Sequence, residues 1–384
     1  MRVGGARVAR RGLVPAVSVG LVVGLGCGGA RAPATDEPRD DPWPMFRREA
    51  RHGGDARDRG PLAWELAWSH ELGARVDASP IVVAAGVVVA TRTGVVVVLD
   101  PEGGAERARA ELGGDVWATP AASAGTIVIG VRRDSGGELV GLDAGDLAVR
   151  WRRPVVSGGF GAATAAGRRV WLCNGAAVVA IDPDDGAELA HLTLDQRCYG
   201  APAIDGGALY VASRDGALRS FDVRTGARRW QAITTAGAFN EVAPVVTDDL
   251  VLIGSNDGHL YGFGPGGDQR WRAGDGDWVV SSPAVADGLA VFGDDGGVER
   301  AVALADGRER WRGKVGNDVA SSAVVIGDHV VHGAHDGKLH AWRLTDGVAR
   351  PPIDAGAPMF ASPAVTGDGL VVIATHAGRV VAIR

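Results

Sequence analysis

The chain has 384 residues and a formal net charge of −6, with 40 Lys and Arg residues against 46 Asp and Glu residues. It shows no stripe of basic residues, so nucleic acid is a poor candidate partner. Gly contributes 59 residues, and because each Gly inside a helix costs about 1 kcal/mol relative to Ala, the composition argues against stacked helices.

Residues 1–27 have the features of an export signal. Several Arg residues precede a short apolar stretch that ends at Cys27. The letters GLGC resemble the lipobox of bacterial lipoproteins, in which Cys27 would be diacylated and become the first residue of the mature chain, although Gly24 stands where Leu is usual. An ordinary secretory signal, an unprocessed anchor and a twin-arginine signal at Arg10-Arg11 remain alternatives.

Residues 28–42 are polar and contain several Pro residues without a periodic pattern, so we expect a flexible tether. Gly28, rather than Asp, follows Cys27. In lipoproteins of Gram-negative bacteria this favours the periplasmic face of the outer membrane. We therefore expect a cell-envelope protein attached to that membrane through a lipid anchor, and no stretch beyond the leader is apolar enough to span a bilayer.

Residues 43–384 contain an eightfold repeat with a period of about 40 residues, which is typical of solenoids, propellers and arrays. Each repeat has a small residue followed by Pro, or by Ala in two repeats. These anchors are Pro80, Pro120, Ala163, Pro202, Pro244, Pro283, Ala323 and Pro363. The residue just before each anchor is always small, which fits an innermost strand near a crowded axis.

Short Val/Ile/Leu/Ala runs within each repeat are separated by Gly-containing turns, which favours β-strands joined by hairpins. The turn between the second and third strands is visible at Thr93-Gly94, Asn174-Gly175, Asp215-Gly216, Asp257-Gly258 and Asp336-Gly337. Four short antiparallel strands per repeat make a propeller blade. The fold class is therefore all-β, an eight-bladed β-propeller of four-stranded antiparallel blades.

The two ends of the repeat region complement each other. A Trp marks the fourth strand in five blades, and Trp68 precedes the first anchor, so its segment is a fourth strand without the other three. The chain ends with three strands that lack a fourth. We expect the Trp68 segment to close the last blade, which removes exposed sheet edges. Ala108, Ala190 and Pro351 stand where Trp is expected, so three blades must fill that space differently.

The position three residues before each anchor is rich in aromatic residues. It holds Asp77, Trp117, Phe160, Tyr199, Glu241, Val280, Ala320 and Phe360. The aromatic side chains either pack between neighbouring blades or rim one mouth of the central channel, where they would dock a partner or a flat ligand. Trp117, Phe160, Tyr199, Glu241 and Phe360 are the candidate partner-binding residues.

Two Cys residues follow the leader, at the same end of adjacent predicted blades. Cys173 ends a second strand and Cys198 begins the next blade's first strand. An oxidising compartment permits a disulfide between them, and the alternative is two separate thiols. A bridge requires Cα atoms within about 7 Å.

The segment DPWPMFRREARHGG at residues 41–54, followed by repeats of the form Ser-Pro, Asp-Gly, Leu-Asp, Gly and Trp, resembles the pyrroloquinoline-quinone-like β-propeller repeat proteins. The resemblance covers about residues 41–384. It implies one of two branches: quinone-dependent dehydrogenases, which use pyrroloquinoline quinone (PQQ) and calcium, or BamB-like lipoprotein propellers that assist outer-membrane β-barrel assembly.

The residues favour the second branch. The acidic residues lie mostly in turns, where Asp caps the backbone, and no long insertion is present to build a quinone and calcium pocket. His329, His332, His335 and His340 cluster in one blade, but loop roles are favoured over a metal site. We expect no catalytic residues, metal or cofactor, and a monomeric, membrane-tethered scaffold for protein partners, with a β-barrel assembly protein as the leading partner. A PQQ-dependent dehydrogenase and an envelope receptor for a ligand or polymer are the alternatives.

Overall fold

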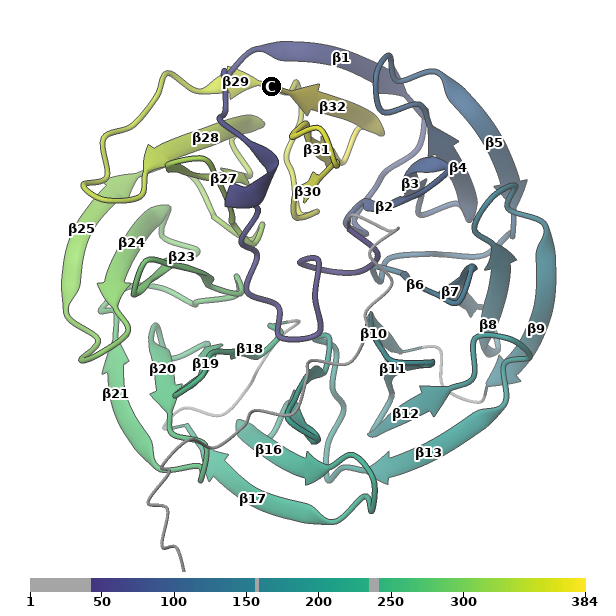
Figure 1. The fold of residues 1–384 in the computed structure, drawn as a ribbon, viewed down its shortest axis with the longest axis horizontal. Coiled ribbons are helices and arrows are strands. Elements are labelled where there is room, and N and C mark those ends of the chain that lie inside the picture. The colour runs from purple at the N-terminus through teal and green to yellow at the C-terminus, as the bar shows by residue number, and fades with distance from the viewer. Residues whose placement is uncertain (1–42, 156–158, 235–241) are drawn as a thin grey trace, which may run out of the picture. The chain divides into compact units, whose positions relative to one another are not determined.

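The computed structural model describes residues 43–155, 159–234 and 242–384. Cys27, the expected tether at residues 28–42 and Glu241 lie outside these ranges. Within them, 32 strands form eight four-stranded antiparallel sheets arranged in a ring (Figure 1). The predicted eight-bladed β-propeller is therefore confirmed. Among the described residues, no helix has the length and apolar character needed to span a membrane.

The first four blades follow one another along the chain, and each runs from an innermost to an outermost strand. Blade I contains β2 (Ile81–Val83), β3 (Gly86–Ala90), β4 (Val95–Leu99) and β5 (Glu106–Glu111), and blade II contains β6 (Ala121–Ser123), β7 (Thr126–Arg133), β8 (Gly136–Asp143) and β9 (Val149–Val155). Blade III contains β10 (Phe160–Ala166), β11 (Arg169–Asn174), β12 (Ala177–Ile181) and β13 (Glu188–Thr193), and blade IV contains β14 (Ala203–Asp205), β15 (Ala208–Ala212), β16 (Ala217–Asp222) and β17 (Arg228–Ile233).

The remaining blades continue the ring. Blade V contains β18 (Val245–Val246), β19 (Val251–Gly254), β20 (Leu260–Phe263) and β21 (Gln269–Ala273), and blade VI contains β22 (Ala284–Ala286), β23 (Leu289–Gly293), β24 (Val298–Ala303) and β25 (Glu309–Lys314). Blade VII contains β26 (Val324–Ile326), β27 (His329–Gly333), β28 (Lys338–Arg343) and β29 (Ile353–Asp354), and blade VIII contains β30 (Ala364–Val365), β31 (Val371–Ala374), β32 (Arg379–Ile383) and β1 (Leu66–Glu71).

Blade VIII is built from both ends of the repeat region. Its strand order is β30-β31-β32-β1, and β1 pairs antiparallel with β32, with Trp68 opposite Ala382. The predicted closure by the Trp68 segment is therefore confirmed. The pairing with β1 covers the outer edge of β32, which would otherwise be open to pairing with other chains.

A Trp on the outermost strand of five blades docks on the next blade. Each indole N–H donates to a backbone carbonyl in the turn between the neighbour's third and fourth strands, over 2.8 Å in every case. The ring lies against a Gly with positive φ, where any Cβ would overlap it. The five pairs are Trp68 with Gly104, Trp151 with Gly186, Trp230 with Gly267, Trp271 with Gly307, and Trp311 with Gly347.

The three blades without this Trp fill the space by other means. After Ala108, the docking Gly of the next blade is replaced by Leu147, which is buried in the same apolar cluster despite its φ of 63°. After Ala190, the Leu192 side chain lies against the next docking Gly. At Pro351 the direction is reversed, because Trp64 donates its indole N–H to the Pro351 carbonyl.

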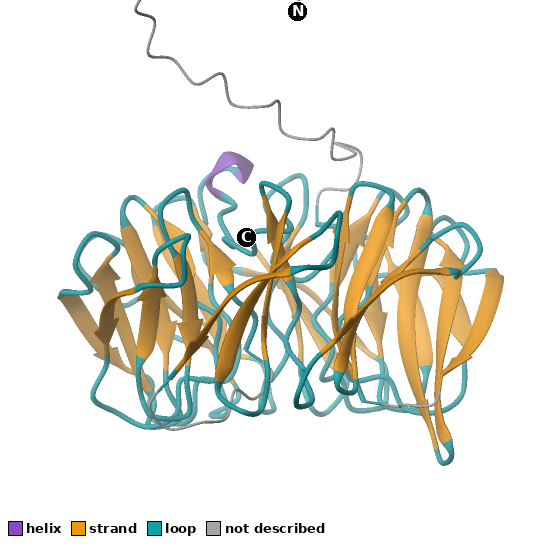
Figure 2. Ribbon diagram, turned by 90° about the horizontal axis from the view of Figure 1, so that it is seen from below, coloured by secondary structure: helices purple, strands orange, loops and turns teal. Residues whose placement is uncertain are grey.

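The chain enters the propeller through a segment that crosses the centre of the ring. We call residues 43–56 the plug; Figure 1 shows it as the purple trace over the axis. In six blades the innermost strand donates a backbone N–H to a plug carbonyl. The donors are Val82, Ala122, Ile204, Val246, Val285 and Val325. The 3-10 helix η1 (Arg57–Arg59) follows the plug on the same face (Figure 2).

Candidate functional site

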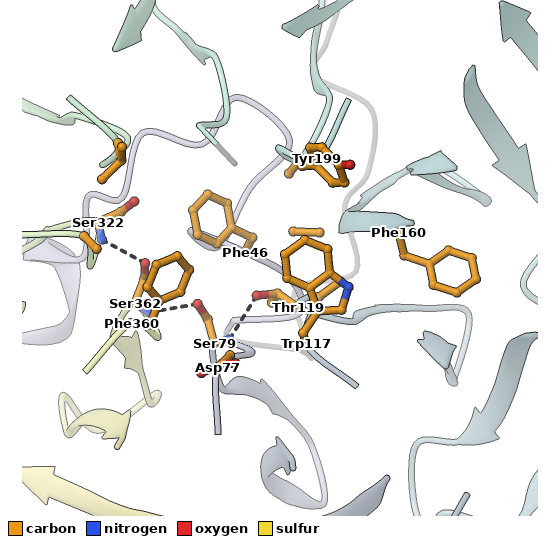
Figure 3. Close-up of a pocket in the computed structure, with 15 residues that line it drawn as sticks. Phe46, Asp77, Ser79, Trp117, Thr119, Phe160, Tyr199, Ser322, Phe360 and Ser362 are labelled. Carbon is orange, nitrogen blue, oxygen red and sulfur yellow. Dashed lines mark hydrogen bonds between the residues drawn. The ribbon is translucent and has the colours of Figure 1, made fainter. Parts of the chain in front are cut away.

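A belt of side-chain hydrogen bonds joins the innermost strands on the channel side. The backbone N–H of the residue before one anchor donates to the hydroxyl of the corresponding residue in the next blade. The donor and acceptor pairs are Ser79 to Thr119, Ala243 to Ser282, Ser282 to Ser322, Ser322 to Ser362, and Ser362 to Ser79, over 2.9–3.0 Å. Figure 3 shows the bonds among Ser79, Thr119, Ser322 and Ser362. The small residues expected from crowding therefore also link the blades.

The belt is interrupted where the corresponding residue is Ala. Ala162, Ala201 and Ala243 of blades III, IV and V have no hydroxyl to accept the bond. Phe46 of the plug packs against all three. An aromatic ring thus occupies the sector of the channel in which the side-chain belt is absent.

Buried polar residues fix the plug in place. The guanidinium of Arg47 is buried and donates to four carbonyls, those of His52, Gly53, Ser282 and Pro283, over 2.7–3.0 Å. Burial lowers the pKa of Arg47 to about 9, so the group stays protonated at neutral pH. His52 is also buried and contacts the Pro244 carbonyl and the Thr164 hydroxyl.

The plug leaves a blind pocket at the opposite mouth of the channel. Figure 3 shows Phe46 at its centre, with belt residues and aromatic side chains around it. The cavity is about 550 Å³, including the space open to solvent. Its lining contains Phe46, the belt residues Ser79, Thr119, Ser322 and Ser362, and the mouth residues Asp77, Trp117, Tyr199, Val280, Ala320 and Phe360.

The four predicted aromatic residues divide between two roles. Trp117, Tyr199 and Phe360 are partly buried at the pocket, and the Trp117 and Tyr199 rings meet edge to face with centroids 5.8 Å apart. Phe160 is fully buried, and its ring lies against Gly130 of the neighbouring blade. The candidacy of Phe160 as a partner-binding residue is therefore corrected: it borders the pocket but packs between blades.

Charged groups at the pocket rim pair with one another. Asp77 accepts from Arg75 over 2.7 Å and from Arg92 over 2.6 Å, and His376 lies 3.1 Å from the same carboxylate. Burial, followed by the charge of Arg75, lowers the pKa of His376, which is therefore neutral at pH 7. The His376 ring also stacks with Phe360, with centroids 6.5 Å apart. The described part of the rim therefore presents aromatic surface beside a cluster of paired charges.

The pocket residues do not fit an anionic quinone held by calcium. Calcium requires several converging oxygen ligands, whereas Asp77 supplies the pocket's carboxylate and is already paired with two Arg residues. Within the described residues, no group of three or more His, Cys, Asp or Glu side chains is placed to hold a metal ion.

The His residues of blade VII have separate partners. His340 contacts Asp336 over 3.0 Å, and His335 lies 3.4 Å from Asp318. His332 is fully buried, with Nε2 3.5 Å from a carboxyl oxygen of the buried Glu299 in blade VI. Burial raises the pKa of Glu299 to about 8 and lowers that of His332 to about 4, so both are neutral at pH 7.

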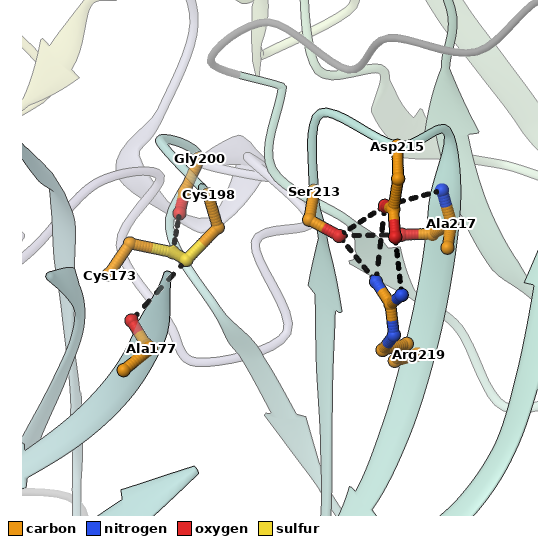
Figure 4. The surroundings of a disulfide bond; sticks show 8 residues. All are labelled: Cys173, Ala177, Cys198, Gly200, Ser213, Asp215, Ala217 and Arg219. Atoms are coloured by element: carbon orange, nitrogen blue, oxygen red, sulfur yellow. Dashed lines mark hydrogen bonds and ion pairs between the residues drawn. A yellow bond between two sulfur atoms is a disulfide. The ribbon is translucent and has the colours of Figure 1, made fainter. Parts of the chain in front are cut away.

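Cys173 and Cys198 form a disulfide whose Cα atoms are 5.6 Å apart (Figure 4). The bond joins β11 of blade III to the segment entering blade IV, and these are two of the blades between which the belt is interrupted. In blade IV, buried Arg219 donates to Ser213 and Asp215 and, over 2.8 Å, to Asp195. The sector without belt hydroxyls is thus reinforced by covalent and ionic contacts.

Sequence reasoning did not identify the plug residues or the belt. The signal for the belt was present, because five of the eight residues before the anchors are Ser or Thr. Phe46 and Arg47 lie outside the repeat, so nothing in the repeat pattern predicted that they fill the channel.

Comparison with known proteins identifies a family whose model matches most of the chain. The family model described as "Outer membrane protein assembly factor BamB" matches residues 55–158, 149–274 and 234–384. A relative of that description from Burkholderia pseudomallei (strain K96243) is 30% identical over 91 residues, which are 24% of this chain and 23% of the relative. The matched region thus spans about a quarter of that relative's length.

Solved structures share the fold at low identity. BamB from Moraxella catarrhalis matches with a TM-score of 0.70 and 19% identity, over 83% of this chain and 99% of that one. The computationally designed Ika8 protein matches with a TM-score of 0.71 and 15% identity, over 83% and 99% of the two chains. The quinohemoprotein alcohol dehydrogenase ADHIIG from Pseudomonas putida HK5 matches with a TM-score of 0.69 and 15% identity, over 88% of this chain and 76% of that one. These structural likenesses support the architecture alone.

Proposed function

The chain belongs to the family of the outer membrane protein assembly factor BamB, and on that premise we propose that it is a non-catalytic scaffold that binds protein partners during assembly of outer-membrane β-barrel proteins. The observation that carries the proposal is the family match, which extends from residue 55 to residue 384 and so includes every blade.

The proposal places the propeller in the periplasm, attached to the outer membrane through lipidated Cys27. A rigid ring joined to a membrane by a tether keeps its loops near membrane-bound partners and raises their effective concentration. The belt, the docked Trp residues and the ring closure support this role, because they hold the blades as one body.

A scaffold needs no cofactor, and the pocket's donor set supports that part of the proposal. Asp77 is engaged by Arg75 and Arg92 instead of being available to a cation. We therefore expect the purified protein to bind neither PQQ nor calcium at high micromolar concentration, and to reduce no dye with alcohols. Quinone binding with a change in visible absorbance would instead support the dehydrogenase alternative.

The experiment that tests the scaffold role is co-purification from solubilised outer membrane. A C-terminally tagged chain should recover a β-barrel assembly protein, identified by mass spectrometry and by reciprocal purification. The matched control is Cys27→Ser, which should be released from the membrane and lose much of that recovery. If only unrelated envelope proteins are recovered, the assembly role is wrong and an envelope receptor becomes the better hypothesis.

A further inference from the structure

We propose that the blind pocket between Trp117, Tyr199 and Phe360 binds a single aromatic side chain of an extended polypeptide that lies across this mouth of the propeller. The three rings are partly buried, and the pocket that they border ends at Phe46 of the plug. The proposal defines a ligand site on the face opposite the plug.

The size and depth of the pocket favour one ring. The cavity measures about 550 Å³ only when the space open to solvent is included, and the part enclosed by side chains is smaller than that. Because the plug closes the far end, a polymer cannot thread through the channel. A side chain that enters from the mouth would end against the Phe46 ring.

The lining selects an uncharged and largely apolar group. Asp77 is paired with Arg75 and Arg92, and Arg92 also pairs with Asp115, so these charged groups of the described rim are engaged with one another. The hydroxyls of Ser79 and Ser362 already accept backbone N–H groups. A sugar needs several hydrogen-bonding partners around its ring, whereas the lining consists mostly of aromatic rings, Ala and Val side chains, and these engaged hydroxyls. An aromatic side chain fits this surface better.

The plug supplies an internal precedent for the occupant. Phe46 enters the same channel from the other face and packs against Ala162, Ala201 and Ala243. The channel therefore already accepts an aromatic side chain from a segment that hydrogen-bonds across the blades. A second aromatic side chain entering from the mouth would meet Phe46 and would contact Trp117, Tyr199 and Phe360 around it. Aromatic pairs of this kind add favourable energy beyond the area that they bury.

The source of the polypeptide rests on the proposed function. Strands of outer-membrane β-barrels carry aromatic residues at both membrane interfaces, so an unfolded barrel chain presents an aromatic side chain repeatedly along its length. A site for one ring would bind such a chain weakly and reversibly at many positions. This is the behaviour required of a scaffold that does not retain its client.

The test measures the binding of a synthetic peptide of about ten residues, the length of one membrane-spanning β-strand, with a single central Tyr. A matched peptide has Leu in place of Tyr, and binding is followed by calorimetry and by cross-linking from a photoreactive Phe analogue at that position. We expect the Tyr peptide to bind about tenfold more tightly than the Leu peptide, with cross-links near Trp117, Tyr199 or Phe360.

Variants locate the site. Trp117→Ala and Phe360→Ala should each weaken Tyr-peptide binding about tenfold, and Ala320→Phe, which fills the pocket from its rim, should abolish it. Trp278→Ala is the matched control, because Trp278 is 51% exposed but is not part of the pocket lining. Since Ala320→Phe adds a side chain instead of removing one, it tests the site even if a truncation impairs folding, and thermal unfolding identifies any unfolded variant.

Equal binding of the Tyr and Leu peptides, cross-links confined to outer strands, or full binding by Ala320→Phe would overturn the proposal. Saturable binding of a neutral oligosaccharide that depends on the same residues, without peptide binding, would also overturn it. Recovery of the assembly protein in the co-purification distinguishes failure of the pocket inference from failure of the proposed function. If recovery persists while the pocket variants bind peptide normally, the pocket inference alone fails. If recovery is absent, the proposed function fails.

Discussion

The hydroxyl of Ser79 accepts the backbone N–H of Ser362 over 2.9 Å, although the two residues are 283 positions apart. This bond closes the belt between the first blade and the last. The pairing of β1 with β32 inside blade VIII joins the two ends of the repeat region at the outer side of the ring. The ring is therefore closed twice, once by a backbone ladder and once by a side chain near the axis.

Replacing Ser79 with Ala should leave the buried N–H of Ser362 without its acceptor. An unsatisfied buried donor costs about 1–3 kcal/mol, so we expect the free energy of unfolding to fall by about that amount, measured by denaturant titration. Ser135→Ala, at an exposed position in the β7–β8 turn, is the control and should change stability by less than about 0.5 kcal/mol. Equal effects of the two substitutions would show that the belt adds no stability.

Leu147 and Ala108 form a reversed version of the Trp and Gly pair found at five other blade junctions. Ala108→Trp alone should clash with Leu147 and lower stability by about 1–3 kcal/mol, and Leu147→Gly alone should leave a cavity. The double substitution restores the usual pair and also relieves the positive φ of Leu147. We expect a favourable coupling energy of at least about 1 kcal/mol in a double-mutant cycle measured by thermal or denaturant unfolding. Additive effects would contradict this account of the junction.

The architecture was predictable from the sequence because it depends on local and repeated signals. Positive φ at Gly94, Gly216 and Gly258 confirms the predicted turns, and the Trp68 segment revealed the closure. Leu147 shows where this reasoning stops. A repeat that lacks the Trp indicates that the space between two blades is filled by another residue. That residue belongs to the next repeat, and in the sequence it occupies an ordinary turn position.

The disulfide between Cys173 and Cys198 should stabilise blades III and IV against separation. Its sequence separation is 25, and closing a loop of that size stabilises a protein by about 3.5 kcal/mol in the chain-entropy model. Reductant should lower the denaturation midpoint of the natural protein and leave the Cys173→Ala, Cys198→Ala double variant unchanged. Two titratable thiols in the unreduced, unfolded protein would show instead that the residues are not bridged.

Glu299 should make stability fall as pH rises. Its pKa lies near 8 in the folded protein against an ordinary 4.5, so between these values the folded state holds a proton that the unfolded state has lost, and this contribution is lost as pH rises through 8. The lowered pKa of His332 acts in the opposite direction, but only between about pH 4 and 6.5. The net fall is therefore expected between pH 6.5 and 8, at no more than about 1.4 kcal/mol per pH unit.

The Glu299→Gln substitution isolates this effect, because the amide has the shape of the neutral acid and does not titrate. We expect the variant to match the natural protein near pH 4, below the ordinary pKa of the carboxyl group, and to be more stable at pH 8, as measured by unfolding temperatures across the range. A variant that is much less stable at pH 7 would mean that Glu299 and His332 form a charged pair instead.

The candidate site was only partly predictable. Trp117, Tyr199 and Phe360 were identified from their position relative to the anchors, but the same rule selected Phe160, which is buried against Gly130 of the neighbouring blade. Period-two alternation predicts which side chains share one face of a strand. It does not predict whether that face borders the channel or the gap between two blades. Phe46 was not predicted because the plug is held by contacts with blades that are far apart in the sequence, and no local pattern indicates such contacts.

The most direct test of the scaffold role is the rate at which newly made outer-membrane β-barrel proteins fold in cells with and without this protein, followed by the heat-modifiable migration of the folded barrels. The account predicts slower folding in cells that lack the protein, restored by the natural chain and poorly restored by Cys27→Ser. Unchanged folding rates in its absence, with the natural level of folded barrels in the outer membrane, would contradict the account.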